Sequence, residues 1–307
     1  MNINKHFKQN DSVLVTGGTG FVGSNLVTKL LSYKIMVHVI ARMDSDLSEL
    51  DTNNELLVVH IFDNKFETMN KIIKKSKPKI IFHLASLFIA EHKSNDIQSL
   101  IESNILFGTF LLEAMIKNDI KLLVNTGTSW EHQEDDSFKP VNLYASSKKA
   151  FSDIIYYYHD ANNLSCITLK LFDTYGQNDK RNKLLSLLKK HALSGERLEM
   201  SQGEQLLDLV EINDVVNAFV CAGIKIIEKG EATIYKEYAI SSGELISLKD
   251  LCVLVSEILE KKLNVIHGAR PYRKREVLRP WQPLKILPNW KPEKNMYLSI
   301  KNFLLEK

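Results

Sequence analysis

Tyr144 and Lys148 are the two side chains in this sequence whose types and spacing best fit proton transfer. Both lie in a predicted helix over residues 142–162, and residues four apart on a helix share one face. An ammonium beside a phenol favours the phenolate, so we expect Lys148 to lower the pKa of Tyr144 and prepare it as an acid or base near neutral pH. Tyr297 and Lys301 have the same spacing, but they lie in a terminal helix, where a solvated face is the better interpretation.

Five predicted strands must position this helix, and they alternate with helical patterns along the first half of the chain: 13–15, 35–40, 56–62, 79–86 and 121–125. Such alternation is typical of a doubly wound parallel sheet. We therefore predict an α/β fold, a Rossmann-like doubly wound parallel sheet with a smaller C-terminal α/β lobe that binds substrate. Ligands of such sheets bind beyond the carboxyl ends of the strands, where the hydroxyls of Thr126 and Thr128 lie.

A glycine cluster follows the first strand and opens the first helix. Strand, glycine turn and helix together point free backbone N–H groups and a positive dipole end at a phosphate. Gly17 allows the tight turn, Gly20 admits a pyrophosphate close to the backbone, and Gly23 lets the helix pack on the strand. An ordinary glycine-rich loop is the alternative, but the flanking strand and helix patterns favour a dinucleotide site.

The end of the second strand indicates which dinucleotide is bound. An acidic residue there usually accepts the ribose hydroxyls of NAD. Here Arg42 occupies that place and no carboxylate follows until Asp44. A cation suits a ribose 2′-phosphate, so we predict NADP(H) in preference to NAD(H), with a solvated surface arginine as the alternative. Asp63, at the end of the third strand, is placed to accept the adenine amino group.

Composition limits the classes of function. The chain has 307 residues, 44% hydrophobic and 25% charged, with a net charge of +3, which argues against disorder and against a nucleic-acid partner. The first ten residues are polar and no uninterrupted apolar run approaches membrane-spanning length. The three cysteines are far apart in apolar elements, as expected for reduced thiols in a cytoplasmic protein. No metal site is predicted.

In combination the motifs resemble the extended short-chain dehydrogenase/reductase family: TGGTGFVGSNL (16–26), HLAS (83–86), SNILFGTFLLEA (103–114) and Tyr144-x-x-x-Lys148 occur in that family's order. The resemblance implies that Tyr144 is the catalytic acid/base and that Lys148 also binds the nicotinamide ribose. Thr128 would hydrogen-bond the reacting oxygen, or Thr126 if the alignment slips across Gly127. Asn104 would brace the core near the lysine. Cofactor contacts are implied for Gly17, Gly20, Phe21, Val22, Gly23, Leu84, Ala85 and Asn104.

The second half is similar to a narrower group, the CDP-abequose and CDP-paratose synthases, at residues 271–277 (PYRKREV) and at Pro280-Trp281. Those enzymes reduce the C4 ketone of CDP-4-keto-3,6-dideoxy-D-glucose. By position, Arg273 and Arg270 are expected to grip the nucleotide diphosphate, as planar bidentate cations do; a solvated loop is the alternative. Further substrate contacts are expected from Asp173, Arg181 and Gln205.

The function expected from this resemblance is NADPH-dependent reduction of the C4 ketone of a nucleotide-linked deoxysugar for surface-polysaccharide biosynthesis, with CDP favoured and dTDP as the alternative. An NAD-dependent C4 epimerase is the rival within the fold. A 4,6-dehydratase is disfavoured, because the Asp-Glu pair of such enzymes does not follow Thr126 or Thr128. The alternative from outside the enzymes is a non-catalytic regulator that binds NADPH. The presence of both Tyr144 and Lys148 weighs against this alternative.

The domain division follows from the same patterns. Residues 1–172, with a returning segment at 206–235, are expected to form the NADP-binding Rossmann domain. Residues 173–205 and 236–307 are expected to form the sugar-nucleotide lobe. Asn213 is the expected cap of the returning helix. By resemblance, the helices at 96–117 and 142–162 would pair in a homodimer.

Overall fold

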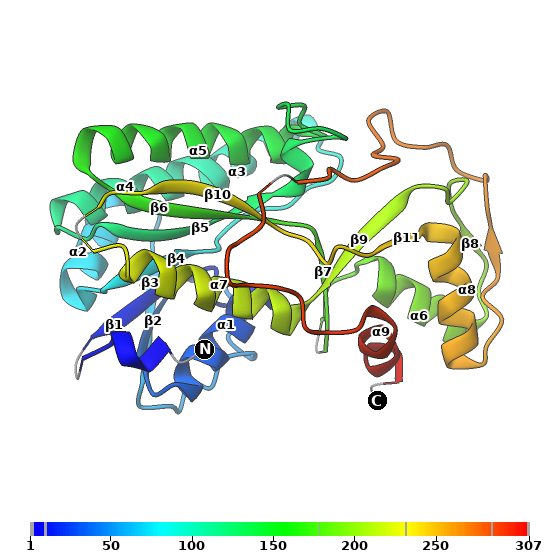
Figure 1. Ribbon diagram of the computed structural model, residues 1–307, viewed down its shortest axis with the longest axis horizontal. Coiled ribbons are helices and arrows are strands. Elements are labelled where there is room, and N and C mark those ends of the chain that lie inside the picture. The colour runs from blue at the N-terminus through cyan, green and yellow to red at the C-terminus, as the bar shows by residue number, and fades with distance from the viewer. Residues whose placement is uncertain (1–2, 9–10, 178, 231, 284, 306–307) are drawn as a thin grey trace.

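Seven parallel strands form the central sheet of the protein, in the spatial order β10-β6-β5-β4-β1-β2-β3. The computed structural model describes residues 3–8, 11–177, 179–230, 232–283 and 285–305, and Figure 1 shows the sheet at the centre of the larger lobe. The doubly wound fold predicted from the sequence is confirmed. The strands are β1 (Ser12–Thr16), β2 (Met36–Arg42), β3 (Leu57–Phe62), β4 (Ile80–His83), β5 (Leu122–Thr128), β6 (Ser165–Leu171) and β10 (Tyr235–Ile240).

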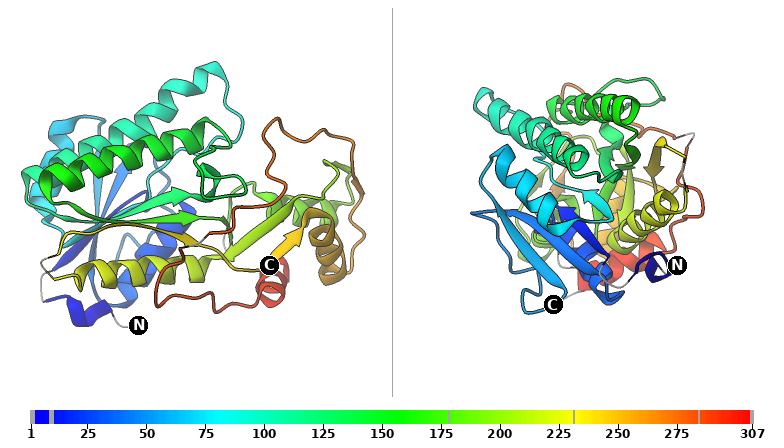
Figure 2. Two further views of the ribbon diagram at one scale, coloured as in Figure 1. Left: turned by 45° about the horizontal axis from the view of Figure 1, so that its top comes forward. Right: turned by 90° about the vertical axis from the view of Figure 1, so that its left-hand side faces the viewer.

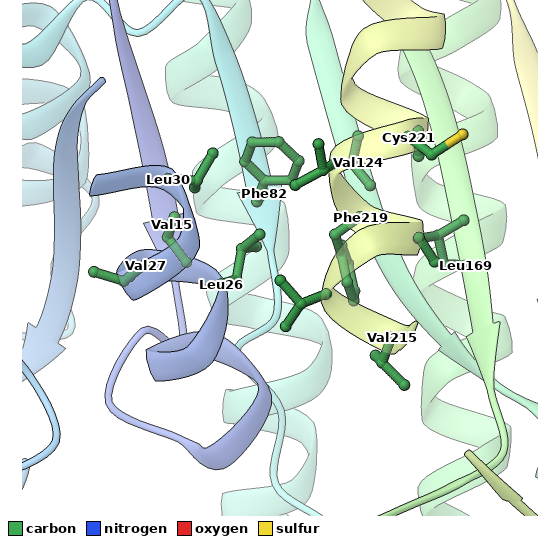
Figure 3. Packing of buried hydrophobic residues seen from close by; sticks show 14 of the residues in the cluster. Val15, Leu26, Val27, Leu30, Phe82, Val124, Leu169, Val215, Phe219 and Cys221 are labelled. Carbon is green, nitrogen blue, oxygen red and sulfur yellow. The ribbon is translucent and has the colours of Figure 1, made fainter. Parts of the chain in front are cut away.

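Helices cover both faces of this sheet (Figure 2). One face packs against α1 (Phe21–Ser32) and α7 (Ile212–Ile227), the other against α2 (Phe66–Ser76), α4 (Phe107–Lys117) and α5 (Leu143–Asn162). Phe82 is fully buried on the first face, between the leucines of α1 and Phe219 of α7 (Figure 3). Strands covered on both faces read as nearly continuous apolar runs, which explains why β1 and β4 carry so few polar residues.

The long helix expected at 96–117 is interrupted. It consists of α3 (Ile97–Ile101), a π-helical turn (Glu102–Leu106) and α4. Among the described helices, Ser94–Lys117 is the stretch that is long and apolar enough to cross a membrane. In the structure α4 lies against α2 and α5 and buries Leu111, Leu112 and Met115 under the sheet, so its apolar residues are part of the core.

A three-stranded sheet, β7 (Asp173–Tyr175), β9 (Leu206–Glu211) and β11 (Leu245–Ser247), forms the centre of the smaller lobe. Around it lie α6 (Leu184–Ser194), α8 (Leu248–Leu259), α9 (Met296–Leu305) and the short pair β8 (Leu198–Glu199) and β12 (Val265–Ile266). Their buried side chains make a separate apolar core that includes Leu188, Leu251 and Ile300.

Strand pairing departs from the expected domain division in two places. β9 pairs with β7 and β11, so the first residues of the segment 206–235 lie in the smaller lobe. β10 pairs with β6 as the seventh strand of the main sheet, although residues from 236 onward were expected in the sugar-nucleotide lobe. The expected cap of α7 is also wrong: Glu211 is the N-cap, and its carboxylate accepts the N–H of Asn213.

The C-terminal segment returns from the smaller lobe to the larger one. Ile286 forms a parallel bridge with Ala239 of β10. The indole of Trp290 donates to the carbonyl of Asp214 at 2.9 Å, and the buried Asp214 carboxylate accepts the N–H groups of Glu293 and Lys294. Residues 286–294 therefore fasten the smaller lobe to the start of α7.

Candidate active site

A cleft of about 440 Å³ lies at the carboxyl ends of β1, β4, β5 and β6, within the range expected for a ligand site. Its wall begins at the glycine turn and passes along β4 and β5 to the start of β7. A narrower part continues into the smaller lobe, and both parts are lined by Ser129, Trp130, Phe172 and Asp173. One ligand can therefore lie against the turn while another reaches it from the smaller lobe.

The glycine turn has the shape of a phosphate cradle. Gly17 has φ +69°, a left-handed conformation that favours glycine, and a Cβ there would lie 2.6 Å from the backbone nitrogen of Ala85. Gly20 is the N-cap of α1 and lines the cleft together with Phe21, Val22 and Gly23. The N–H groups of the first turn of α1 are thus directed toward the cleft, which fits the pyrophosphate of a dinucleotide.

Tyr144 lies in the first turn of α5 and is 9% exposed, facing the cleft. Asn142 caps this helix by accepting the N–H of Ala145 at 2.9 Å, which fixes where the first turn begins. The phenol of Tyr144 hydrogen-bonds with the hydroxyls of Ser86 and Thr128, and its ring packs edge-on against Phe88. The structure therefore surrounds the tyrosine hydroxyl with two further hydroxyl groups.

The pKa of Tyr144 is raised, contrary to the expectation from its spacing to Lys148, which is not among the groups that shift it. Burial raises the pKa of Tyr144 to about 12, and the charge of Glu131 adds to this. Lys148 is 1% exposed, and burial lowers its pKa to about 8 although Glu131 opposes the change. Desolvation penalises the charged form of each group, and the sequence spacing alone does not report how deeply both side chains are buried.

The two threonines of β5 have different partners. The hydroxyl of Thr126 donates to the carbonyl of His83 at 2.9 Å, so it holds β5 to β4. The hydroxyl oxygen of Thr128 accepts the N–H of Trp130 at 3.2 Å, which leaves its proton free to be donated. Because Thr128 also contacts Tyr144, the geometry favours Thr128 over Thr126 as the partner of the tyrosine.

Ser86 was not among the residues predicted for the site. Its hydroxyl donates to Asn104 at 3.3 Å, and the same amide oxygen accepts the N–H of Leu87 at 2.7 Å. The amide nitrogen of Asn104 donates to Ser147 and to the carbonyl of Leu87. Asn104 thus joins the end of β4 to α5 from its π-helical turn. The signal for Ser86 was available, since it is the polar residue that ends the predicted strand 79–86.

The narrower part of the cleft carries three of the predicted substrate contacts, Asp173, Gln205 and Arg273. The Asp173 side chain faces the cleft, but protein atoms surround its carboxylate. Burial raises its pKa, while Lys183, Arg181 and Arg273 lower it. Trp281 forms one wall, stacked on His132 with ring centroids 4.2 Å apart. Lys183, which the sequence analysis did not select, lies over the ring of Phe88 at 3.7 Å.

Two predicted substrate contacts lie elsewhere. Arg181 is held by Asp179 through two hydrogen bonds of 2.7 Å, and its guanidinium lies 4.3 Å from the ring centroid of Phe21. It therefore lines the half of the cleft that contains the glycine turn. Arg270 is exposed, and its backbone N–H donates to the carbonyl oxygen of Met200. It is not among the described residues that line either part of the cleft.

Arg42 ends β2 and Asp63 directly follows the neighbouring strand β3, at the same edge of the sheet as the glycine turn. Arg42 is exposed and lies 3.6 Å from the carboxylate of Asp44. A hydrogen bond from Thr68 lowers the pKa of Asp63. Neither side chain is among the described residues that line the cleft. Either one would contact a bound ligand only if that ligand extended beyond β1 toward β2 and β3.

The fold and cleft together define a short-chain dehydrogenase/reductase that uses a nicotinamide cofactor. Residues 13–236 match the NAD dependent epimerase/dehydratase family, and the chain belongs to this family.

The similarity to individual relatives and to a solved structure extends over nearly the whole chain. CDP-abequose synthase of Salmonella typhimurium is 26% identical over 306 residues, covering 95% of this chain and 97% of the relative. CDP-abequose synthase of Yersinia pseudotuberculosis is 25% identical and covers 94% and 98%. UDP-glucose 4-epimerase of Thermus thermophilus, solved in complex with NAD, has a TM-score of 0.81 at 21% identity over 95% of this chain and 97% of its own, a likeness of fold.

Proposed function

We propose that the protein reduces the C4 ketone of a nucleotide-linked 4-keto-deoxysugar with NADPH, and that its substrate is CDP-4-keto-3,6-dideoxy-D-glucose. The observation that carries the proposal is the continuity of the cleft: Tyr144 and Thr128 line the part with the glycine turn, and Arg273 lines the part that continues into the smaller lobe. The likeness to CDP-abequose synthases over 95% of the chain supports the choice of substrate.

Tyr144 is suited to giving a proton at this site. With a pKa near 12 it holds its proton at neutral pH, so a phenol is available to protonate an oxygen that gains charge during reduction. Thr128, whose hydroxyl oxygen accepts the N–H of Trp130, can donate its hydroxyl proton to the same oxygen. Lys148, with a pKa near 8, is mostly cationic at neutral pH and lies one helical turn after Tyr144 on α5. The nicotinamide cofactor supplies the hydride when bound.

The narrower part of the cleft is suited to the nucleotide. Arg273 lies there beside the aromatic wall of Trp281 and Phe172. A guanidinium pairs well with a diphosphate, and the indole and phenyl faces suit a base or a sugar ring. Asp173 lies where the two parts meet and can accept a sugar hydroxyl. These residues would orient the ketone toward Tyr144.

The preference for NADPH is part of the proposal and depends on Arg42. Its exposed guanidinium ends β2 beside the glycine turn, where a ribose 2′-phosphate would be held. We also propose a cytoplasmic homodimer, paired through the helical stretch 96–117 (α3, the π-helical turn and α4) and through α5. This is supported by the exposed apolar residues of these helices and of the π-helical turn between α3 and α4, Ile97, Ile101, Leu106, Tyr156 and Tyr157.

The deciding experiment follows NADPH oxidation with freshly generated CDP-4-keto-3,6-dideoxyglucose, in parallel with the CDP- and dTDP-linked 4-keto-6-deoxyglucoses. Rapid oxidation with the first substrate alone would support the proposal. Oxidation with another would keep the ketone reduction and replace the substrate. No oxidation with any of the three, together with NAD retained through purification, would favour a C4 epimerase.

A further inference from the structure

A buried lysine lies behind the catalytic side of the cleft. Lys170 of β6 is 4% exposed, and its ammonium contacts three acceptors. These are Glu131 Oε2 at 3.1 Å, Glu237 Oε2 at 3.0 Å and His132 Nε2 at 2.9 Å. The contact with His132 is a hydrogen bond, and the contacts with the two carboxylates are ion pairs. Although burial opposes its charge, the two carboxylates raise the pKa of Lys170, and it stays cationic.

This arrangement fixes the tautomer of His132. Its Nδ1 lies 3.1 Å from the carbonyl oxygen of Ser137, which can only accept, so Nδ1 carries the proton. Nε2 is then the lone-pair nitrogen and accepts from Lys170. Burial lowers the pKa of His132, and the charge of Lys170 lowers it further. A neutral imidazole with one defined orientation therefore lies against Trp281 in the wall of the narrower part of the cleft.

Glu131 connects the lysine to Thr128. Its side chain is fully buried, and its Oε1 accepts the N–H of Thr128 at 3.1 Å while Oε2 contacts Lys170. Gly127 provides the space for this contact, because a Cβ there would lie 3.2 Å from Glu131 Oε1 and 3.0 Å from Cγ of Lys170. The glycine between the two threonines therefore leaves room for the carboxylate that contacts Thr128.

We propose that Lys170 and Glu131 are positioning residues, which hold Thr128 in the orientation that lets its hydroxyl act beside Tyr144. The catalytic importance of this Thr128 orientation rests on the proposed function. The competing explanation is a capping box, in which Thr128 and Glu131 cap the short helix Ser129–Glu131. A capping box uses Glu or Gln equally well, whereas a residue that must accept the N–H of Thr128 and also pair with the Lys170 ammonium needs a carboxylate.

The experiment compares Glu131→Gln with Glu237→Gln. Each variant removes one carboxylate from Lys170, but Glu237 is 30% exposed at its side chain and has no contact with Thr128 among the described hydrogen bonds. A glutamine at 131 has one acceptor oxygen and no charge to pair with the ammonium, so either Thr128 or Lys170 loses its contact with residue 131. We expect Glu131→Gln to lower kcat at least about tenfold with little change in KM, and Glu237→Gln to keep the kcat of the wild type.

A second pair of variants tests the lysine. Lys170→Met should reproduce the loss of kcat in Glu131→Gln, and Lys170→Arg should recover most of it, because a guanidinium can still contact both carboxylates. A cluster that only stabilises the fold would change the melting temperature in both Met and Gln variants and leave kcat unchanged in the folded protein. That result would overturn the proposal.

A measurement that needs no catalytic turnover can test this positioning role independently of the proposed function. The protein is labelled with ¹³C-methyl threonine, and the Thr128 resonance is assigned from Thr128→Ser. We expect the resonance to move in Glu131→Gln and Lys170→Met and to stay in place in Glu237→Gln. If the wild-type protein reduces no sugar ketone, the proposed function is refuted. The Thr128 resonance would still decide whether Glu131 and Lys170 position Thr128. An unmoved resonance in Glu131→Gln would overturn the positioning role.

Discussion

A Cβ on Gly23 would lie 2.1 Å from the carbonyl oxygen of Gly17. The first turn of α1 therefore packs directly on the backbone that leaves β1, with no room for a side chain. Gly20 differs, since its φ is −85° and a Cβ there would lie 3.4 Å from the same oxygen, an ordinary contact. Packing therefore requires glycine at position 23, whereas the fold itself leaves room for a Cβ at position 20.

Gly23→Ala and Gly20→Ala should therefore have different effects. Gly23→Ala should lower the free energy of unfolding by about 3 kcal/mol, because the added methyl group meets backbone that cannot move aside. Gly20→Ala should unfold like the wild type but bind NADPH at least about tenfold more weakly, because its methyl group would stand in the phosphate cradle. Urea denaturation and fluorescence titration with NADPH measure the two quantities. Equal loss of stability in both variants would contradict this account.

Tyr144→Phe should lower kcat by about a thousandfold, the size expected when a general acid is removed. Tyr297→Phe is the matched control, because Tyr297 and Lys301 repeat the same spacing in α9, where Tyr297 is 47% exposed. Cofactor affinity should change little in either variant. Steady-state kinetics with the proposed ketone and a titration with NADPH provide the measurement. Full activity of Tyr144→Phe would remove the tyrosine from the mechanism.

Lys148→Met should make the protein more stable at pH 7 while removing activity. The folded-state pKa is near 8 and the ordinary value is 10.5, so below pH 8 folding buries a charged lysine. As pH rises from 8 to 10.5 the folded protein loses this proton before the unfolded chain does, and the penalty disappears. We expect a gain of roughly 2 to 3 kcal/mol at pH 7 that shrinks above pH 8.

Urea denaturation of this variant at pH 7 and pH 9.5 measures the change. Lys301→Met is the control, because Lys301 is exposed in α9 and its removal should alter stability little at either pH. A Lys148→Met protein that is less stable than the wild type at pH 7 would show that the buried ammonium stabilises the fold.

Arg42→Ser should weaken NADPH binding by about ten- to a hundredfold and leave NADH binding unchanged, because only NADPH carries a phosphate for the guanidinium to pair with. Lys65→Ser removes another exposed cation at the same sheet edge, one that pairs with Asp63, and should change neither affinity. Dissociation constants for both cofactors provide the comparison. Equal affinities of wild type and Arg42→Ser for NADPH would mean that Arg42 pairs only with Asp44.

The sequence was sufficient for the parts of the fold and site that depend on local patterns. The glycine turn, the five strands from β1 to β5 and the Tyr144 helix each have a signal within a few residues. Thr126 and Thr128 could not be separated in this way, because both follow the same strand. Their roles differ only through long-range partners, His83 for Thr126 and Tyr144 for Thr128.

Other features had no local signal. The contacts of Lys170 join residues 39 and 67 positions apart from it, Glu131 and Glu237, and single-sequence patterns do not report such pairs. β10 reads YKEYAI, a mixed pattern that fits an edge strand of the main sheet as well as a strand of the smaller lobe. The pKa of Tyr144 depends on burial from elements far apart in the sequence, which the helix spacing cannot reveal.

The smaller lobe is not a contiguous piece of the chain. Its sheet takes β7 and β9 from one stretch and β11 from another, and α7 and β10, which lie between β9 and β11 in the chain, belong to the larger lobe. Recombination at a single crossover therefore cannot transplant this lobe between relatives as one cassette. Changes of substrate in such a scaffold must arise from point substitutions and short loop replacements, such as those within residues 269–282 that carry Arg273 and Trp281.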